Sequence, residues 1–491
     1  MTCQPLRLCI LILASAVCAS CGGGGATETG TVATPTVTTP VVPDAPQFFE
    51  GNILLAAPTD TSIKMLVLTP RSGAVNVAYQ SNLAMQDIQM AAGMITPNVP
   101  KEIQLTGLKP NTRYTYKLTL QTSTGSLVSS TYSFSTAKPV GSSFTFTLQA
   151  DSHLDENSDL AVYKQTLNNV LLDQPDFHID LGDTFMTEKY SEPLSATLQA
   201  AANAAIVNQR YVYERNNFGL MTHSVPLFLV NGNHEQAARY LLNGTPNNVA
   251  VWAQNARNSL YAQPAPNAFY SGNTEQIPFV GLLRNYFAWT WGDALFVVID
   301  PYWESPVAVD NQFGGTTKRL SMWDVTHGDA QYNWLKRTLE QSKAKFKFVF
   351  AHHVMGTGRG GIELAKLWEW GGESQNGQID FATQRPSWTT PIHQLMAANK
   401  VSIFFQGHDH IWVRQKLDGV TYQTLSQPAD PNYTLWNADA YLSGDKFPNT
   451  GYTRVSVNPN QVKVDYVRTY LQKDEGPGKV HGEVAFSYTL P

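Results

Sequence analysis

Five short apolar runs in this chain each end in residues that could bind metal ions or transfer protons. Residues 144–149 lead into Asp151 and His153, and residues 177–181 lead into Asp183. Runs ending at residues 230, 351 and 405 lead into Asn233-His234-Glu235, His352-His353 and His408-Asp409-His410. Buried parallel strands have this pattern, and ligands of α/β proteins gather beyond the carboxyl ends of strands. Helical segments between the runs, such as 160–172 and 196–213, favour β-α-β units.

The side chains expected at this edge are two carboxylates, one amide and five imidazoles. They are Asp151, Asp183, Asn233, His153, His234, His352, His408 and His410. Oxygen and imidazole donors without thiolate suit Zn, Mn and Fe. The set exceeds what one ion of ordinary coordination number can use, so the pattern predicts two metal ions per chain with a bridging carboxylate.

These residues form five sequence blocks: D-x-H, G-D, G-N-H-E, a lone H and G-H-x-H, in that order. In this the chain resembles the calcineurin-like metallophosphoesterases over residues 143–470. The resemblance implies an α/β (α+β) fold in which two packed mixed β-sheets are flanked by helices.

The resemblance also implies a role for each residue of the set. The metal ligands would be Asp151, His153 and His410 for the first ion, Asn233, His352 and His408 for the second, and Asp183 as the bridge. His234 would stand beside the substrate and donate a hydrogen bond or a proton to the phosphate ester. In the fourth block His353 is an alternative to His352, which takes the position of the first residue in the family's H-x-P. Glu235 is expected to orient a neighbouring group.

The purple acid phosphatases share this core and carry a fibronectin-like N-terminal domain. They place an iron-bound tyrosinate three residues after the bridging aspartate, where this chain has Met186. Because methionine cannot replace that ligand, the layout resembles a purple acid phosphatase without its purple chromophore.

The predicted reaction is hydrolysis of phosphate esters by metal-bound hydroxide. Two cations (Fe, Mn or Zn) would lower the pKa of a bound water, and His234 would help to offset charge on the phosphoryl oxygens. Phosphomonoesterase activity is favoured by analogy of domain layout, with phosphodiesterase or nucleotidase activity as the alternative. A surface adhesion protein with a catalytically silent phosphatase scaffold is a further alternative, against which the complete ligand set argues.

An insertion at residues 355–388 follows the fourth block. As a lid it would bring Arg359 to the phosphate, for which Asn233 is a second candidate binding residue, and its tryptophans to an organic leaving group. As an ordinary loop it would bury Trp368, Trp370 and Trp388 against the core.

Residues 48–138 have the composition of strands. Leu108, Pro110, Tyr114 and Tyr116 lead into one strand and resemble the tyrosine corner of immunoglobulin-like sandwiches. The segment is therefore similar to a fibronectin type III domain, a small all-β sandwich in which the Tyr114 hydroxyl would anchor a loop. It would serve adhesion or substrate positioning, or act as a structural domain packed on the larger C-terminal part of the chain.

All four cysteines lie within the first 21 residues. Residues 1–21 have the charge and the short apolar run of an export signal. The segment from Cys18 to Cys21 resembles a bacterial lipoprotein signal, in which Cys21 would be lipidated, although an ordinary signal peptide is the alternative. Residues 22–46 would be a Thr/Pro/Gly-rich linker. We therefore expect an exported protein, either an outer-membrane or cell-surface lipoprotein or a periplasmic or secreted protein.

Composition excludes several other functions. The 491 residues carry a net charge of −5 without a basic patch, so no nucleic-acid partner is expected beside the small phosphate-ester substrate. The absence of cysteine after residue 21 excludes disulfides, thiolate-bound zinc and a cysteine nucleophile. The predicted organisation is a signal peptide (1–21), a linker (22–46), a β-sandwich (48–138) and a metallophosphoesterase domain (143–491).

Overall fold

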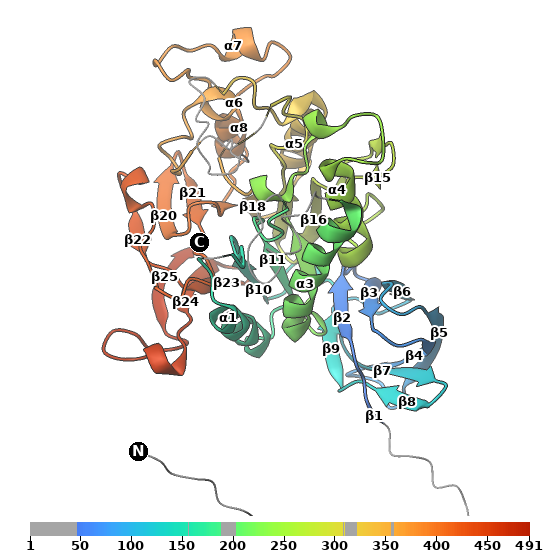
Figure 1. Cartoon of the computed structure of the whole chain (residues 1–491). Coiled ribbons are helices and arrows are strands. Elements are labelled where there is room, and N and C mark those ends of the chain that lie inside the picture. The colour runs from blue at the N-terminus through green and yellow to red at the C-terminus, as the bar shows by residue number, and fades with distance from the viewer. Residues whose placement is uncertain (1–46, 156, 188–202, 308, 310–321, 355–357) are drawn as a thin grey trace, which may run out of the picture. The chain divides into compact units, whose positions relative to one another are not determined.

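The computed structural model describes residues 47–491, except for 156, 188–202, 308, 310–321 and 355–357 (Figure 1). The predicted signal peptide, the linker and the lipidation site at Cys21 lie outside the described residues and stay predictions. The described chain belongs to one compact unit. None of its described helices is both long and apolar enough to cross a membrane.

The N-terminal part is a sandwich of two β-sheets. The larger sheet has the order β1(Gln47–Phe48), β8(Gly125–Val128), β7(Arg113–Thr122), β4(Gly73–Ser81) and β5(Ile88–Ile95), with β9(Tyr132–Ser135) also on β7. The smaller sheet has the order β2(Asn52–Ala56), β3(Ser62–Leu68) and β6(Lys101–Thr106). Burial alternates along β4, as expected of a strand with one face on a core. The Tyr114 hydroxyl accepts a hydrogen bond from the Lys109 N–H at 2.8 Å, which confirms the predicted tyrosine corner and immunoglobulin-like sandwich.

The sandwich packs on the C-terminal part of the chain through β2 and β3. Leu54 and Leu66 share an apolar cluster with Phe218 of α3(Ala204–Thr222). The buried Arg215 guanidinium, also on α3, donates a hydrogen bond to Leu66 O at 2.7 Å. These contacts fit the structural role expected of the sandwich.

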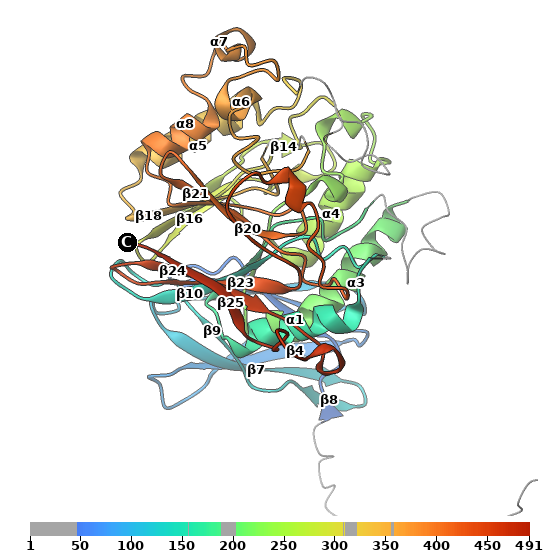
Figure 2. The same ribbon diagram turned by 90° about the vertical axis from the view of Figure 1, so that its left-hand side faces the viewer.

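Two mixed sheets form the centre of the C-terminal part, and Figure 2 shows them as two layers. The first has the order β12(Leu227–Leu229), β11(Phe177–Asp180), β10(Phe144–Gln149), β23(Gly451–Val457), β24(Val462–Arg468) and β25(Val484–Leu490). The second has the order β13(Ser271–Gly272), β16(Phe287–Trp291), β17(Ala294–Val298), β18(Phe346–Phe350), β19(Ile403–Gln406), β21(Val420–Thr424), β20(Trp412–Leu417) and β22(Asp445–Phe447).

Aromatic side chains join the facing sides of these sheets. The ring of Phe146 on β10 meets that of Phe296 on β17 edge to face, with centroids 5.1 Å apart, and Phe177 on β11 meets the same ring at 5.2 Å. In each sheet the strands that carry the sequence blocks run parallel: β10, β11 and β12 in the first, and β18 and β19 in the second. The predicted pair of packed mixed sheets is confirmed.

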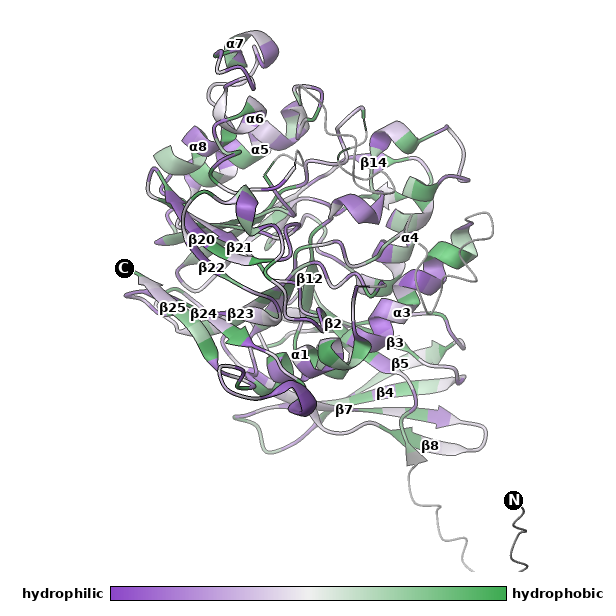
Figure 3. Ribbon diagram, turned by 60° about the vertical axis from the view of Figure 1, so that its left-hand side comes forward, coloured by the Kyte–Doolittle hydropathy of each residue, from purple (hydrophilic) through white to green (hydrophobic). Residues whose placement is uncertain are grey.

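Helices cover the outer side of each sheet (Figure 1). On the first sheet they are α1(Leu160–Leu172), α3 and α4(Val249–Tyr261). On the second they are α5(Gly328–Gln341), α6(Trp368–Gly371) and α8(Ile392–Ala398), and α7(Phe381–Gln384) lies beyond α6 and α8 (Figure 1). The α1 helix matches the predicted range, and its N-terminus is capped by Asp159. The predicted helix at 196–213 begins among residues outside the described part, and α3 continues to Thr222; Figure 3 shows both apolar and hydrophilic residues along it.

The remaining short elements lie in the connections between these strands and helices. They are β14(Gln276–Ile277), β15(Gly281–Leu282), η1(Asn233–Glu235), η2(Arg239–Leu241), η3(Ala438–Ala440) and η4(Gln472–Asp474). In the described part of the insertion, Trp368, Trp370 and Trp388 belong to an apolar cluster on the second sheet. The Trp388 ring stacks on Tyr332 with centroids 3.9 Å apart. The tryptophans thus pack as in the ordinary-loop alternative, because indole rings buried against the sheet are not presented to a leaving group.

Candidate metal centre

The sequence blocks meet at the carboxyl ends of the parallel strands. Asp151 and His153 follow β10, Asp183 follows β11, His234 lies on η1 after β12, and His352 follows β18. His410 follows β19 and joins them. These six residues form three overlapping groups, in each of which the candidate ligand atoms lie within 4.8 Å of one another.

The backbone turns sharply between the ends of the strands and the candidate metal ligands that follow them. Asp151, His153, Asp183, His408 and His410 have φ values of 62°, 52°, 54°, 71° and 52°, in the left-handed region that non-glycine residues seldom adopt. Such conformations persist where the surrounding structure enforces them, typically at functional sites.

Two motif glycines allow the close approach of the loops. A Cβ atom on Gly232 would lie 2.3 Å from Asp183 Oδ1, and one on Gly407 would lie 2.7 Å from Asp151 Oδ2. Both contacts are shorter than van der Waals distance, so glycine at these two positions is required by the positions of the carboxylates.

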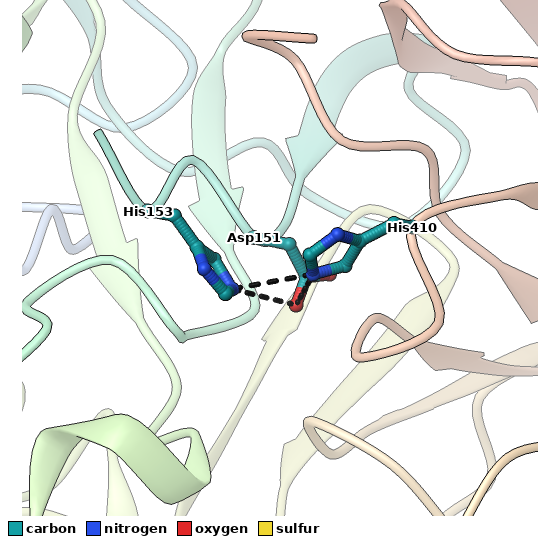
Figure 4. A group of neighbouring side chains, drawn as sticks. All are labelled: Asp151, His153 and His410. Carbon is teal, nitrogen blue, oxygen red and sulfur yellow. Dashed lines mark hydrogen bonds and ion pairs between the residues drawn. The ribbon is translucent and has the colours of Figure 1, made fainter. Parts of the chain in front are cut away.

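Asp151, His153 and His410 form the first group, which Figure 4 shows converging from two loops. Asp151 Oδ1 lies 3.8 Å from His153 Nε2 and 3.5 Å from His410 Nε2, and the two imidazole nitrogens are 3.2 Å apart. Asp151 Oδ1 is buried without a hydrogen-bond partner. A buried anionic oxygen facing two imidazole nitrogens is a donor set that fits a divalent cation.

Asp183 connects this group to the others. Its Oδ2 atom lies 3.0 Å from His352 Nε2, and 3.8 Å from both His153 Nε2 and His234 Nε2. One carboxylate oxygen therefore faces imidazoles that follow β10 and β18 and an imidazole on η1. A carboxylate oxygen that faces imidazoles from three parts of the chain fits the binding of metal ions.

Three of the candidate ligand rings are held at Nδ1. His352 Nδ1 pairs with Leu181 O at 2.8 Å, His153 Nδ1 with Asp155 Oδ2 at 3.2 Å, and His408 Nδ1 with Asp409 Oδ1 at 2.9 Å. Metal-binding histidines typically donate their second ring N–H to such a group, which sets the tautomer and the ring orientation. Asp155 and Asp409 were not expected from the sequence, although each lies within two residues of a block histidine.

Glu235 organises the loop between β11 and the centre. Its carboxylate accepts hydrogen bonds from the N–H groups of Asp183, Thr184 and Phe185, at 3.0, 2.8 and 3.0 Å. Glu235 thus orients its neighbours, as expected from the sequence, by satisfying the backbone that presents Asp183.

The centre concentrates negative charge that needs compensation. Burial opposes ionisation of Asp151, but the neighbouring imidazoles of His153, His410 and His352 outweigh it and hold the pKa of Asp151 below its usual range. Burial lowers the pKa of His352, but the carboxylates of Asp183 and Asp151 dominate and raise it to about 10. These shifts have one physical cause, since buried carboxylates favour positive charge beside them. Divalent cations would supply that charge.

His234 differs from His153 and His352, whose pKa values are raised by nearby carboxylates. Burial lowers the pKa of His234 to about 4, although Asp183 partly opposes the shift. The ring is therefore neutral near pH 7 and offers an N–H as a hydrogen-bond donor.

The other predicted site residues lie around the cluster. His408 donates its backbone N–H to Asp151 Oδ2 at 2.7 Å, and its ring centroid is 5.3 Å from that of His352. Asn233 is buried on η1 beside His234. His353 stacks on the His408 ring and pairs through Nδ1 with Tyr302 at 2.7 Å, so His352, and not His353, faces Asp183.

Two further residues bear on the expectations from sequence. Arg359 lies at the edge of the site, where its guanidinium donates hydrogen bonds to His408 O and, at 3.4 Å, to Asp409 Oδ1. Met186 is fully buried and belongs to none of the candidate ligand groups found among the described residues.

Comparisons with known proteins agree with this geometry. A model of the calcineurin-like phosphoesterase family matches residues 144–412. The chain is similar in fold to the purple acid phosphatase PPD1 from yellow lupin (Lupinus luteus) seeds, with 16% identity and a TM-score of 0.58, covering 89% of this chain and 73% of that one. It is also similar to the structure of PhoD, with 14% identity, a TM-score of 0.62 and 91% of both chains covered. No match was found among the curated proteins.

Proposed function

This chain belongs to the calcineurin-like phosphoesterase family, and on that premise we propose that it hydrolyses small phosphate esters with two divalent metal ions bound at the candidate centre. The observation that carries the proposal is the position of Asp183 Oδ2, which faces His352 on one side and His153 on the other. A catalytically silent scaffold would gain nothing from these buried carboxylates and imidazoles, because burial of ionisable groups costs stability.

The chain offers a ligand set for each ion. Asp151, His153 and His410 would hold the first, Asn233, His352 and His408 the second, and Asp183 would be shared by both. When bound, the ions would supply Lewis-acid charge and lower the pKa of a water molecule at the centre. Their identity is proposed only as far as the donors indicate, namely Fe, Mn or Zn.

The residues beside the ligands would bind the substrate. The neutral His234 ring, whose Nε2 is 3.8 Å from Asp183 Oδ2, would donate a hydrogen bond to the phosphate ester. Arg359, which is about one third exposed, would present positive charge to the phosphate from the edge of the site. Both groups would offset charge that develops on the phosphoryl oxygens.

We propose phosphomonoesters as the preferred substrates, with diesters and nucleotides as the alternatives. The support is the fold shared with a purple acid phosphatase, together with an N-terminal β-sandwich of the kind that those enzymes carry. The phosphomonoesterase proposal therefore rests on analogy of layout, and a substrate screen must decide it.

The test combines metal analysis with a substrate screen. Purified protein would be freed of metal with a chelator, reloaded with Mn, Fe or Zn, and assayed with p-nitrophenyl phosphate, bis-p-nitrophenyl phosphate and nucleotides. We expect two ions per chain and fastest turnover of the monoester. Protein that takes up no metal and turns over none of these substrates would favour the adhesion scaffold.

For the cellular location we propose export and lipid attachment through Cys21. The support is the sequence of the first 21 residues alone. Incorporation of labelled fatty acid into the wild type but not into Cys21→Ser would support this; equal labelling of both would contradict it.

A further inference from the structure

One tryptophan of the chain is exposed to solvent. The chain has eleven tryptophans, all of them among the described residues, and Trp436 alone is exposed, at 45%. Leu435 beside it is 50% exposed. Within the described part of the chain, the Trp436 indole stacks on no other ring and its N–H donates no hydrogen bond. Tryptophans with a free apolar face and a free N–H are typical of binding surfaces.

The loop that carries Trp436 is attached to the last sequence block. The side chain of the next residue, Asn437, donates a hydrogen bond to Asp409 O at 2.8 Å, and the Tyr441 hydroxyl donates one to Asp409 Oδ2 at 2.6 Å. Asp409 directly precedes His410, which belongs to the first candidate ligand group. The exposed tryptophan is therefore next to a residue that is bound to the loop of the metal centre.

Further contacts hold the same loop in place. Tyr441 packs in an apolar cluster with Ile411, the residue that follows His410. The ammonium group of Lys446 donates a hydrogen bond to Ala438 O at 2.8 Å. A loop that is fixed before a ligand binds loses little conformational freedom on binding, so contacts with its exposed side chains can contribute to affinity.

Arg359 adds positive charge beside this loop. Its guanidinium, whose side chain is 37% exposed, donates a hydrogen bond to Asp409 Oδ1 at 3.4 Å. The next residue, Gly360, donates its N–H to Asp409 Oδ2 at 2.8 Å, and a Cβ atom on it would lie 3.2 Å from Ala440 O. Two adjoining segments next to the last sequence block therefore carry a positive charge and an exposed apolar surface.

From this arrangement we infer that Trp436 and Leu435 form a subsite for the organic leaving group, and that phosphate esters with an aromatic leaving group are the preferred substrates. The inference rests on the proposed function and names the substrate class for the same centre. With the phosphate bound at the centre near Arg359, the leaving group would extend over the Trp436 indole. The tryptophans of the 355–388 insertion do not offer this contact, because they are packed on the second sheet.

The test compares two phosphomonoesters that differ only at a distance from the phosphorus atom. Propyl phosphate and 3-phenylpropyl phosphate both have primary alkyl leaving groups, so a difference in kcat/KM reports contacts of the phenyl ring. Metal-loaded wild-type protein should favour the phenylpropyl ester about tenfold, an effect typical of a contact between aromatic rings. Trp436→Ala should lose this preference, whereas its kcat/KM for propyl phosphate should remain that of the wild type.

Two further variants serve as controls. Trp436→Phe keeps an aromatic ring and should retain most of the preference for the phenylpropyl ester. Phe48→Ala removes an aromatic side chain that is 71% exposed on the N-terminal sandwich, and both rates should remain those of the wild type. An unchanged preference in Trp436→Ala, or an equal loss of activity on both esters, would overturn the inference.

A measurement of binding without turnover completes the test. The phosphonate analogues of the two esters are not hydrolysed, and calorimetry can follow their binding to metal-loaded protein. The wild type should bind 3-phenylpropylphosphonate about tenfold more tightly than propylphosphonate, and Trp436→Ala should bind both equally. Equal binding of the two phosphonates by the wild type would overturn the inference alone if p-nitrophenyl phosphate is hydrolysed. Metal-loaded wild type that hydrolyses none of the esters would overturn the proposed function, and the inference with it.

Discussion

The N-terminal sandwich and the strand ends of the phosphoesterase domain bury different kinds of side chain. Among the described residues of the sandwich, the buried polar side chains are all serine and threonine. The strand ends instead bury carboxylates and imidazoles, with Asp151 and His352 fully inaccessible. Burying an ionisable group is costly unless it is compensated. The sandwich therefore gains stability from apolar burial. At the strand ends, burial of carboxylates and imidazoles costs stability, but it holds these groups close together.

Of the substitutions considered, loss of the Asp183 carboxylate at the strand ends should reduce activity most. Asp183→Asn should lower kcat/KM by well over about 100-fold, the upper range for groups that only orient a metal ligand. Burial opposes ionisation of Asp183, but the neighbouring imidazoles hold its pKa below the usual range, so loss of this charge should also lower the free energy of unfolding of the metal-free protein. Phosphatase kinetics and thermal unfolding in chelator measure both. Turnover near that of the wild type would contradict the proposed role of Asp183.

The next largest effect is expected at His234. Removal of one donor to the developing charge typically costs about 10²–10³ in kcat, so His234→Ala should lose activity by that factor. Its metal content should stay that of the wild type if His234 binds substrate only. Since His234 Nε2 lies 3.8 Å from Asp183 Oδ2, metal analysis of the variant is decisive. A missing ion in His234→Ala would make this residue a ligand.

Buried charge also predicts a pH dependence of stability for the phosphoesterase domain. Burial raises the pKa of Glu214 on α3 to about 8 from its ordinary value of 4.5, and both carboxylate oxygens lack a hydrogen-bond partner. The folded state then keeps a proton that the unfolded state releases, so the free energy of unfolding falls as pH rises between these values. Glu214→Gln should remove this loss and be more stable than wild type at about pH 9, by on the order of a few kcal/mol.

Chemical denaturation at two pH values measures this effect. At about pH 5 the advantage of Glu214→Gln should shrink strongly, because wild-type Glu214 is then protonated in the folded state. A difference between the two proteins that is the same at both pH values would show that Glu214 does not titrate as its burial implies.

The smallest effect is expected in the sandwich. Tyr114→Phe removes the acceptor of the Lys109 N–H and should cost about 1 kcal/mol of stability. Activity per folded molecule should remain that of the wild type, since the Tyr114 hydroxyl contacts a loop of the sandwich and belongs to none of the candidate ligand groups. A loss of activity without a loss of stability would mean that the sandwich contributes to the site.

The fold could be predicted to the extent that it follows from local patterns. The strand-like composition of residues 48–138 and the tyrosine corner identified the sandwich, and apolar runs ending in polar blocks identified β10, β11, β12, β18 and β19. The extent of α3 and the choice between the two alternatives for the 355–388 insertion depend on contacts with distant parts of the chain, so the sequence did not decide them. Arg215 on α3, for example, reaches Leu66 of the sandwich.

The chemical groups available at the site follow from the amino-acid sequence alone, because the spacing of the blocks places Asp151, His153, Asp183, His352 and His410 after parallel strands. How those groups are used depends on the folded chain. Folding turned His352 toward Asp183 by binding its Nδ1 to Leu181 O across the two sheets, and packed His353 against Tyr302. It also brought Asp409 to Gly360 and Tyr441, which are distant in sequence. Residue type is a property of one position, but tautomer, orientation and charge balance depend on neighbours that only folding brings together.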